Sequence, residues 1–272
     1  MPKATPNLLI FGCGKMGSAM LAGALAGGWP ASAIAVVEPH PSEALADLQK
    51  RHGFALNPAR PGGAKLVLVS VKPQMLDAAA PAILPWLTGE SVVVSIMAGK
   101  SIADIARRLP ATTRFVRAMP NTPAAIGRGI TGAYATGALN DDDRALVTRL
   151  LQTTGRLEWV INEGLIDAVT AVSGSGPAYV FHLVEALTSA GEKLGLEPAI
   201  AARLARATIE GAGELLFQES ETSPETLRRN VTSPGGTTAA ALEVLMGDDD
   251  GLTALMTRAV AAAEARAKAL SG

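Results

Sequence analysis

The chain has 272 residues, a length that suggests two domains, and 48% of them are hydrophobic, which is enough for a sizeable core. Its formal net charge of −1 argues against binding to nucleic acid or an anionic membrane surface, because both need a basic excess. The single cysteine, Cys13, excludes an internal disulfide, and the apolar stretches fall far short of the ~20 residues of a membrane helix, so we expect a cytoplasmic protein.

From Leu8 to about Ile161, short apolar segments alternate with segments of helical pattern. Several apolar segments are uninterrupted, as expected of central parallel strands covered on both faces. The alternation predicts a parallel sheet wound by helical crossovers. The expected strands are Leu8–Gly12, Ala33–Val37, Lys65–Val71, Ser91–Met97, Arg114–Ala118, Gly129–Ala135 and Leu157–Ile161. The expected helices are Met16–Ala26, Ser42–Arg51, Gln74–Trp86, Ile102–Arg108 and Asp141–Thr153.

The first expected strand runs into a glycine-rich segment, GCGKMG from Gly12 to Gly17, and the first expected helix follows. In this pattern the first glycine permits a tight turn, the second lets the backbone approach a pyrophosphate, and the third lets helix and strand pack closely. The helix N-terminus supplies free N–H groups for the anion. We therefore expect a Rossmann-type dinucleotide-binding domain over residues 1–163, with the cofactor at Gly12, Cys13, Gly14, Lys15 and Met16.

Glu38 ends the second expected strand, about 20 residues after the glycine segment. An acid at this position accepts hydrogen bonds from the adenosine ribose and repels a 2′-phosphate. The next arginine along the sequence is Arg51, so no guanidinium close in sequence favours that phosphate. The expected cofactor is NADPH or NADH, and Glu38 favours NADH. The alternative is that Glu38 is a solvated strand end.

Three further strand ends carry small or polar residues at the same expected edge of the sheet. Ligands of open α/β sheets bind at the carboxyl ends of the strands, so these segments predict a nicotinamide pocket. The candidate cofactor residues there are Val71, Lys72, Pro73, Ala98 and Asn121.

After Glu163 the expected strands stop, and residues 165–271 have an almost wholly helical pattern rich in Ala, Leu and Glu. We therefore predict an α/β domain followed by an all-α domain of residues 164–272. Aromatic residues make up only 4% of the chain, and Ala and Gly let helices approach closely. We expect such a domain to complete its core against a second copy of the chain, as a homodimer that stands alone or forms part of a higher homo-oligomer.

Three segments resemble signature stretches of the pyrroline-5-carboxylate reductase family: RAMPNTP at Arg117–Pro123, AVSGSGPAYVF at Ala171–Phe181 and NVTSPGGTTAAA at Asn230–Ala241. The resemblance extends from the glycine segment to the last helices, and the third segment is the most specific. It implies a Rossmann domain followed by a helical dimerisation domain that interlocks with a second subunit. It also implies hydride transfer from NAD(P)H to the C=N bond of 1-pyrroline-5-carboxylate, which gives L-proline.

The resemblance further implies roles for residues in and near the helical half. It puts the Thr238 hydroxyl near the ring nitrogen as the catalytic group and Asn230 at the cofactor. The substrate-binding residues that it implies are Glu163, Ser233, Gly235, Gly236, Thr237 and Thr238.

The turn at Pro234–Gly236 is also suited to a carboxylate on physical grounds. It precedes an Ala-rich helix, so its backbone N–H groups can converge on an anion. Thr237 and Thr238 then serve either as a helix cap or as hydroxyl donors. The alternative is an ordinary capped helix start, for which two glycines are a costly choice.

Other interpretations stay open at this point. Ser173–Gly176 either packs under the nicotinamide edge or contacts the substrate, and Tyr179 is either a core residue or a ligand contact. The β-hydroxyacid dehydrogenases share the two-domain plan, but their helix Lys and Asn are replaced here by Val180 and Leu183. We expect no metal site, because no His/Cys cluster has ligand spacing. The rival functions are a reductase of another small cyclic imine or keto acid, and a non-catalytic dinucleotide sensor.

Overall fold

The structure is a computed structural model that describes residues 7–59 and 62–271. The chain divides into two compact units, one made of Met1–Gly174 with Ala263–Gly272 and the other of Ser175–Ala262. The sequence places the border at residues 163 and 164 instead. Residues beyond it belong with the first unit because α6 (Leu165–Val169) packs on the sheet and Ala267 is buried.

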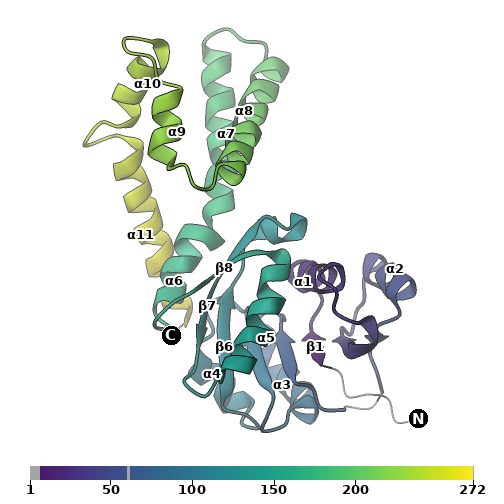
Figure 1. Cartoon of the computed structure of the whole chain (residues 1–272). Helices are drawn as coiled ribbons and strands as arrows, with labels where there is room; N and C mark the ends of the chain where they lie inside the picture. Colours follow the sequence, from purple (N-terminus) through teal and green to yellow (C-terminus); the bar gives the residue numbers. More distant parts are fainter. Residues whose placement is uncertain (1–6, 60–61, 272) are drawn as a thin grey trace. The chain divides into compact units, whose positions relative to one another are not determined.

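The first unit is built on an eight-stranded sheet with the order β3-β2-β1-β4-β5-β6-β7-β8 (Figure 1). Its central strands form because their residues are apolar on both faces, and every residue of β1, β4 and β5 is buried. The strands are β1 (Leu8–Phe11), β2 (Ile34–Val37), β3 (Ala55–Leu56), β4 (Leu66–Val69), β5 (Val92–Ser95), β6 (Arg114–Met119), β7 (Gly129–Ala135) and β8 (Gly155–Trp159).

Helices cover both faces of this sheet. One core cluster joins α1, α2 and α5 to alternate residues of the strands, and the other joins α3 and α4 to the residues between them. These helices are α1 (Lys15–Ala26), α2 (Glu43–His52), α3 (Leu76–Ile83), α4 (Ile102–Arg108) and α5 (Asp141–Leu151). Three of them begin with a side-chain cap from Ser42, Ser101 or Asn140. The expected helix Gln74–Trp86 is divided into 3₁₀ segments at Pro73–Met75 and Leu84–Trp86, each with a proline at its start, and α3 between them, which contains Pro81.

The expected parallel sheet is confirmed except at one pair, because β7 runs antiparallel to β6. A parallel neighbour needs a crossover of a dozen or more residues, usually a helix. The connection from Met119 to Gly129 holds only a short 3₁₀ segment, Thr122–Ile126. β8 then pairs parallel to β7 through α5 and starts at Gly155, two positions before the expected strand.

The second unit contains only helices within residues 175–262, as expected. They are α7 (Gly176–Lys193), α8 (Pro198–Gln218), α9 (Pro224–Asn230), α10 (Thr237–Leu245) and α11 (Leu252–Ser271), whose last residues belong to the first unit. α7 and α8 form a hairpin in Figure 1. None of the helices in the described ranges has the length and hydropathy of a membrane span.

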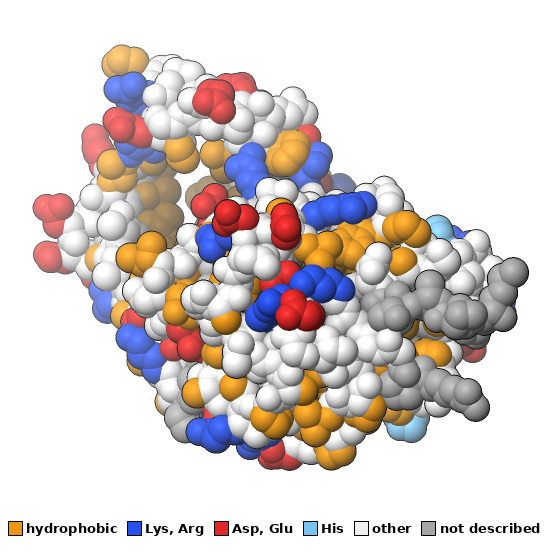
Figure 2. Space-filling view, turned by 60° about the horizontal axis from the view of Figure 1, so that its bottom comes forward, with side chains coloured by type: hydrophobic (Ala, Val, Ile, Leu, Met, Phe, Trp, Pro, Cys, Tyr) orange, Lys and Arg blue, Asp and Glu red, His pale blue; other side chains and the backbone are white. Residues whose placement is uncertain are grey.

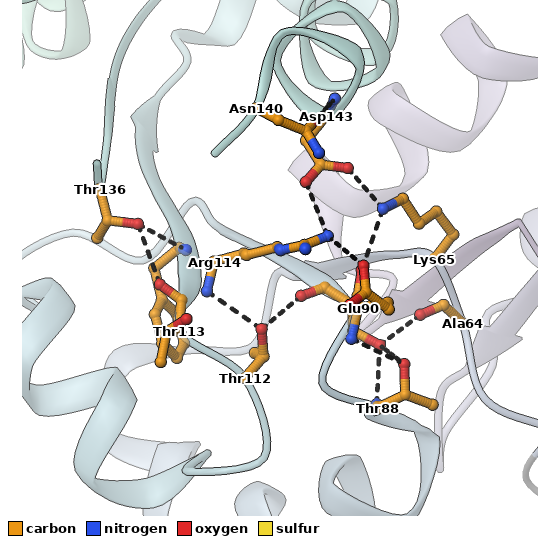
Figure 3. A network of polar contacts seen from close by, with 12 residues as sticks. Ala64, Lys65, Thr88, Glu90, Thr112, Thr113, Arg114, Thr136, Asn140 and Asp143 are labelled. Atoms are coloured by element: carbon orange, nitrogen blue, oxygen red, sulfur yellow. Dashed lines mark hydrogen bonds and ion pairs between the residues drawn. The ribbon is translucent and has the colours of Figure 1, made fainter. Parts of the chain in front are cut away.

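A buried carboxylate organises the amino edge of the sheet (Figure 3). Asp143, in the first turn of α5, forms ion pairs with Lys65 before β4 and with Arg114 at the start of β6, whose Nη1 lies 3.1 Å from Oδ2. Arg114 also reaches the exposed carboxylate of Glu90 at 2.7 Å. On the face drawn in Figure 2, Lys and Arg side chains lie interspersed with Asp and Glu.

Candidate cofactor-binding and substrate-binding sites

The glycine segment occupies the turn between β1 and α1, and two of its glycines are required by close packing. Gly12 has φ +85°, and a Cβ there would lie 2.9 Å from Cγ1 of Val71. A Cβ on Gly17 would lie 2.5 Å from the carbonyl oxygen of Gly12. A Cβ on Gly14 would meet nothing within 4 Å, so the backbone there faces open space that a ligand can enter.

The N-terminus of α1 is left free to bind an anion. Gly14 is its N-cap, no side chain caps it, and none of its first-turn residues is acidic. Uncapped N–H groups and the helix dipole both favour a phosphate at this point. Strand order reverses between β1 and β4, which is where dinucleotides bind in open α/β sheets. These residues therefore fit a pyrophosphate.

Ser70 fixes this turn, a role that was not predicted from the sequence. It follows β4, its backbone N–H donates to the carbonyl of Phe11 at 2.9 Å, and its hydroxyl donates to the carbonyl of Gly12. The turn is thereby tied to the neighbouring strand. The only signal in the sequence is a small polar residue directly before Val71, Lys72 and Pro73.

Glu38 lies beside the glycine turn, as the sequence predicts for a ribose ligand. Its Oε2 accepts a hydrogen bond from the N–H of Cys13 at 2.8 Å, and its Oε1 accepts one from the N–H of His40 at 3.0 Å. A carboxylate offers about four lone-pair sites, so two of them stay available for ribose hydroxyls. The interpretation of Glu38 as a merely solvated strand end does not explain its bond to the glycine turn.

Cys13 is a buried thiol within the same turn. Burial raises its pKa above the ordinary 9.0, the hydrogen bond with Ser18 lowers it, and the nearby charge of Glu38 raises it. Cys13 is therefore a neutral group that contributes its backbone N–H to Glu38 rather than a nucleophile.

The remaining cofactor candidates of the first unit follow strand ends that are in register. Phe11 pairs with Val37 and with Val69, and Val69 pairs with Ser95, so these strands end at one edge. Lys72 and Ala98 are exposed there, and Lys15 and Met16 open α1. Asn121 is engaged differently, because its Oδ1 accepts the N–H of Ile130 at 3.0 Å and so shapes the loop after β6.

Glu163, a candidate substrate ligand, has partners within the first unit. Its Oε1 accepts the N–H of Ile102 at 2.7 Å, at the start of α4, and lies 3.5 Å from Nη1 of Arg117. Arg117 is 3% exposed, and its Nη2 donates to Oδ1 of Asp167 at 2.8 Å. This arrangement joins β6, α4 and α6, so the visible role of Glu163 is to hold these elements together.

The candidate substrate turn lies in the second unit, before α10. Gly235 has φ +68°, and the N–H of Gly236 donates to the carbonyl of Ser233 at 3.0 Å. Gly236 itself is the N-cap of α10, no side chain caps the helix, and its first turn holds no acid. Gly236, rather than Thr237 or Thr238, occupies the N-cap position, and the role of the two threonines as hydroxyl donors stays a prediction. The free amides of this helix start fit a carboxylate.

Two other candidates lie at element borders. Asn230 ends α9 and is exposed. Ser173, in the π-helical turn Thr170–Gly174, donates its hydroxyl to the carbonyl of Val169 at 3.0 Å. A Cβ on Gly174 would lie 3.7 Å from Sδ of Met119, which is ordinary contact. Within the described residues, no three His, Cys, Asp or Glu side chains are grouped as metal ligands would be.

Comparison with known proteins agrees with this geometry. A family model described as pyrroline-5-carboxylate reductase dimerisation matches residues 163–270, and one described as NADP oxidoreductase, coenzyme F420-dependent, matches residues 7–99. The pyrroline-5-carboxylate reductase of Pseudomonas aeruginosa is 39% identical, with 98% of each chain covered.

Solved structures show the same similarity along the whole chain. A pyrroline-5-carboxylate reductase from Coxiella burnetii is 34% identical with a TM-score of 0.89, covering 99% of this chain and 100% of that one. A pyrroline carboxylate reductase from Plasmodium falciparum, with NADP bound, is 26% identical with a TM-score of 0.78, and 98% of each chain is covered. The family models that match the two parts of the chain both describe oxidoreductases, and the one over residues 7–99 names NADP. The chain belongs to the pyrroline-5-carboxylate reductase family.

Proposed function

We propose that this protein reduces 1-pyrroline-5-carboxylate to proline with NADH or NADPH. The observation that carries the proposal is that two of the three uncapped, acid-free starts among α1–α10 follow glycine-containing turns. One is the start of α1 after the glycine turn in the first unit, and the other is the start of α10 after the Ser233–Gly236 turn in the second, whereas the third, α7, begins after Ser175 with a proline in its first turn. The first suits the pyrophosphate of a dinucleotide, and the second suits the carboxylate of a small substrate. A dinucleotide sensor has no need of the second.

The reaction needs little acid–base chemistry from the protein. When bound, the reduced nicotinamide would supply a hydride to the carbon of the C=N bond of a substrate that enters already protonated on nitrogen. The iminium proton stays on that nitrogen, so the protein need not supply an acid. Thr238, in the first turn of α10, holds the ring nitrogen with its hydroxyl. The Ser233–Thr237 turn fixes the carboxylate, so most of the acceleration comes from proximity and orientation. Asn230 contributes to the cofactor side of this site.

Glu38 favours NADH over NADPH in this proposal. The carboxylate accepts hydrogen bonds from both ribose hydroxyls, whereas a 2′-phosphate brings about two negative charges to the same place. At an effective dielectric constant near 20, with screening, the repulsion costs about 1 to 3 kcal/mol. The Plasmodium relative was solved with NADP, so the preference has to be measured on this chain.

The helical unit joins two copies of the chain. None of the 18 residues of α7 is buried, although the helix contains Val180, Phe181, Leu183 and Leu187. The facing helix α8 likewise exposes Leu204, Leu215 and Phe217. Apolar residues in this number on a helical hairpin need a covering surface, and a second copy supplies it.

Steady-state rates with NADH and NADPH test the reaction directly. The substrates are racemic pyrroline-5-carboxylate, pyrroline-2-carboxylate and a piperideine carboxylate, each at several concentrations. We expect the highest kcat/KM with pyrroline-5-carboxylate. A higher value with another imine would reassign the substrate. Tight dinucleotide binding without turnover of any imine would instead identify a sensor.

A further inference from the structure

Asn57 binds the backbone of Glu38, the proposed ligand of the adenosine ribose. It follows the two-residue edge strand β3, and its backbone N–H donates to the carbonyl of Val36 at 2.8 Å. Its side-chain Oδ1 accepts the N–H of Glu38 at 2.8 Å, and its Nδ2 donates to the carbonyl of Glu38 at 2.8 Å. One amide side chain thus satisfies both backbone polar groups of Glu38.

The Asn57 side chain extends the hydrogen bonding between β2 and β3 beyond the last backbone pair of these strands. The β2–β3 ladder ends at Val36 and Leu56, and the amide of Asn57 offers Glu38 one donor and one acceptor, as the next strand residue would. Glu38 lies beyond the end of β2, where the main chain has no ladder partner of its own. The contact therefore orders the main chain at the point from which the Glu38 carboxylate projects.

The backbone of Asn57 is itself unusual. Its φ of +46° makes it the single non-glycine residue with positive φ in the described ranges. Such residues are uncommon, and asparagine tolerates this conformation because its short polar side chain makes local hydrogen bonds. Asn57 thus combines an uncommon backbone conformation with an amide that bonds both backbone polar groups of Glu38.

We propose that Asn57 is a positioning residue for cofactor choice: it fixes Glu38 so that the carboxylate faces the glycine turn and rejects a 2′-phosphate. The carboxylate already accepts the N–H of Cys13 at 2.8 Å, so the negative charge is fixed at the turn that receives the dinucleotide. Without the two hydrogen bonds from the Asn57 amide, the end of β2 can move and the Glu38 side chain can turn into solvent, where its charge is screened. This inference rests on the proposed cofactor site and on the proposed role of Glu38.

The test uses Asn57→Gly, because glycine accepts a positive φ and only the amide is lost. Dissociation constants for NADH and NADPH are measured by titration calorimetry on the full chain. The preference for NADH should fall about fivefold in Asn57→Gly, the value of roughly one hydrogen bond. Glu38→Gln should lower it at least as far. In the double variant Asn57→Gly/Glu38→Gln, the ratio should equal that of Glu38→Gln alone.

Asn140→Gly is the matched control. Asn140 caps α5 by accepting the N–H of Asp143 at 2.8 Å, next to the Lys65 and Arg114 network at the amino edge of the sheet. It should lower the melting temperature and leave the cofactor ratio unchanged. An unchanged ratio in Asn57→Gly, beside a changed one in Glu38→Gln, rejects the role of Asn57 alone. A native preference for NADPH, or no binding of either dinucleotide, rejects the proposed cofactor site or its Glu38 assignment and this inference with it.

Discussion

Arg117 and Asp167 form a buried ion pair that joins β6 to α6, with Nη2 of the arginine 2.8 Å from Oδ1 of the aspartate. Oε1 of Glu163 lies 3.5 Å from Nη1 of the same arginine. β6 leads directly into the Met119–Pro123 segment of the expected nicotinamide edge. Two carboxylates thus hold one cation within the sheet, immediately before a segment that the cofactor is expected to contact.

Arg117→Met should destabilise the protein by about 3 to 5 kcal/mol, because it leaves two partly buried carboxylates without their cation. Arg107→Met removes the cation of an exposed pair with Asp104 and should cost less than about 1 kcal/mol. Urea unfolding monitored by circular dichroism compares the two. Equal losses in both variants would contradict a special role for the buried pair.

Asp143→Asn should be strongly destabilising, by about 3 kcal/mol, since Lys65 and Arg114 lose their shared counter-charge. Glu90→Gln makes the same chemical change within the same network (Figure 3), but the Glu90 side chain is 74% exposed, so its loss should stay below about 1 kcal/mol. The affinity for dinucleotide should be unaffected in both, because the network lies at the opposite edge of the sheet. A large change in that affinity would show long-range coupling.

Thr238→Val keeps the shape of the side chain and removes the hydroxyl, so kcat/KM for pyrroline-5-carboxylate should fall. The loss of transition-state stabilisation that this fall measures should be roughly 1 to 2 kcal/mol. Thr253→Val makes the same change at the second residue of α11, outside the proposed site, and is the control for an effect on a helix start. An unchanged kcat/KM in Thr238→Val would remove Thr238 from the mechanism.

Gly235→Ala should distort the substrate turn, because Gly235 has φ +68° and alanine resists that conformation. The KM for the imine should rise at least about tenfold, or ~1.4 kcal/mol. Gly195→Ala offers a matched strain, since Gly195 has φ +95° in the α7–α8 connection and equally open surroundings. Both variants should lose stability, but only Gly235→Ala should change KM.

The Cys13 thiol should titrate above pH 9.0, the ordinary value, because burial disfavours the thiolate. A pKa raised by folding contributes stability that is complete below pH 9.0 and is lost as the pH rises through the folded value. The pH dependence of iodoacetamide alkylation measures this pKa. Glu38→Gln should lower it, because the neighbouring negative charge also raises the pKa of Cys13. Rapid alkylation of the native protein at neutral pH would contradict the prediction.

The sequence predicted the features that depend on local pattern. The apolar runs of β1, β4 and β5 and the spacing of Gly12, Gly14 and Gly17 have few alternative structures, and all of them lie as expected. The direction of β7 was missed because it depends on the length of a connection rather than on the strand itself. The family and the α/β-then-helical order are confirmed, whereas the roles of the individual site residues stay predictions.

Local sequence pattern does not predict the residues that position the candidate ligands, such as Asn57. Asn57 follows a strand of two residues, too short for any periodic signal, and its bond to Glu38 joins segments 19 residues apart. The partners of Glu163 are likewise distant along the chain, at Ile102 and Arg117. Such contacts form only when the sheet is assembled, so they cannot be predicted from residue type and spacing.

The return of α11 to the first unit has a consequence for biosynthesis. Residues 263–272 complete that unit, where the carbonyl oxygen of Leu270 would lie 2.9 Å from a Cβ on Gly99. A nascent chain emerges from the ribosome N-terminus first, and its domains usually fold in that order. Here the α/β unit cannot close its surface around Gly99 until residues 263–271 have been translated. The whole helical unit is therefore synthesised before the α/β unit can complete its fold.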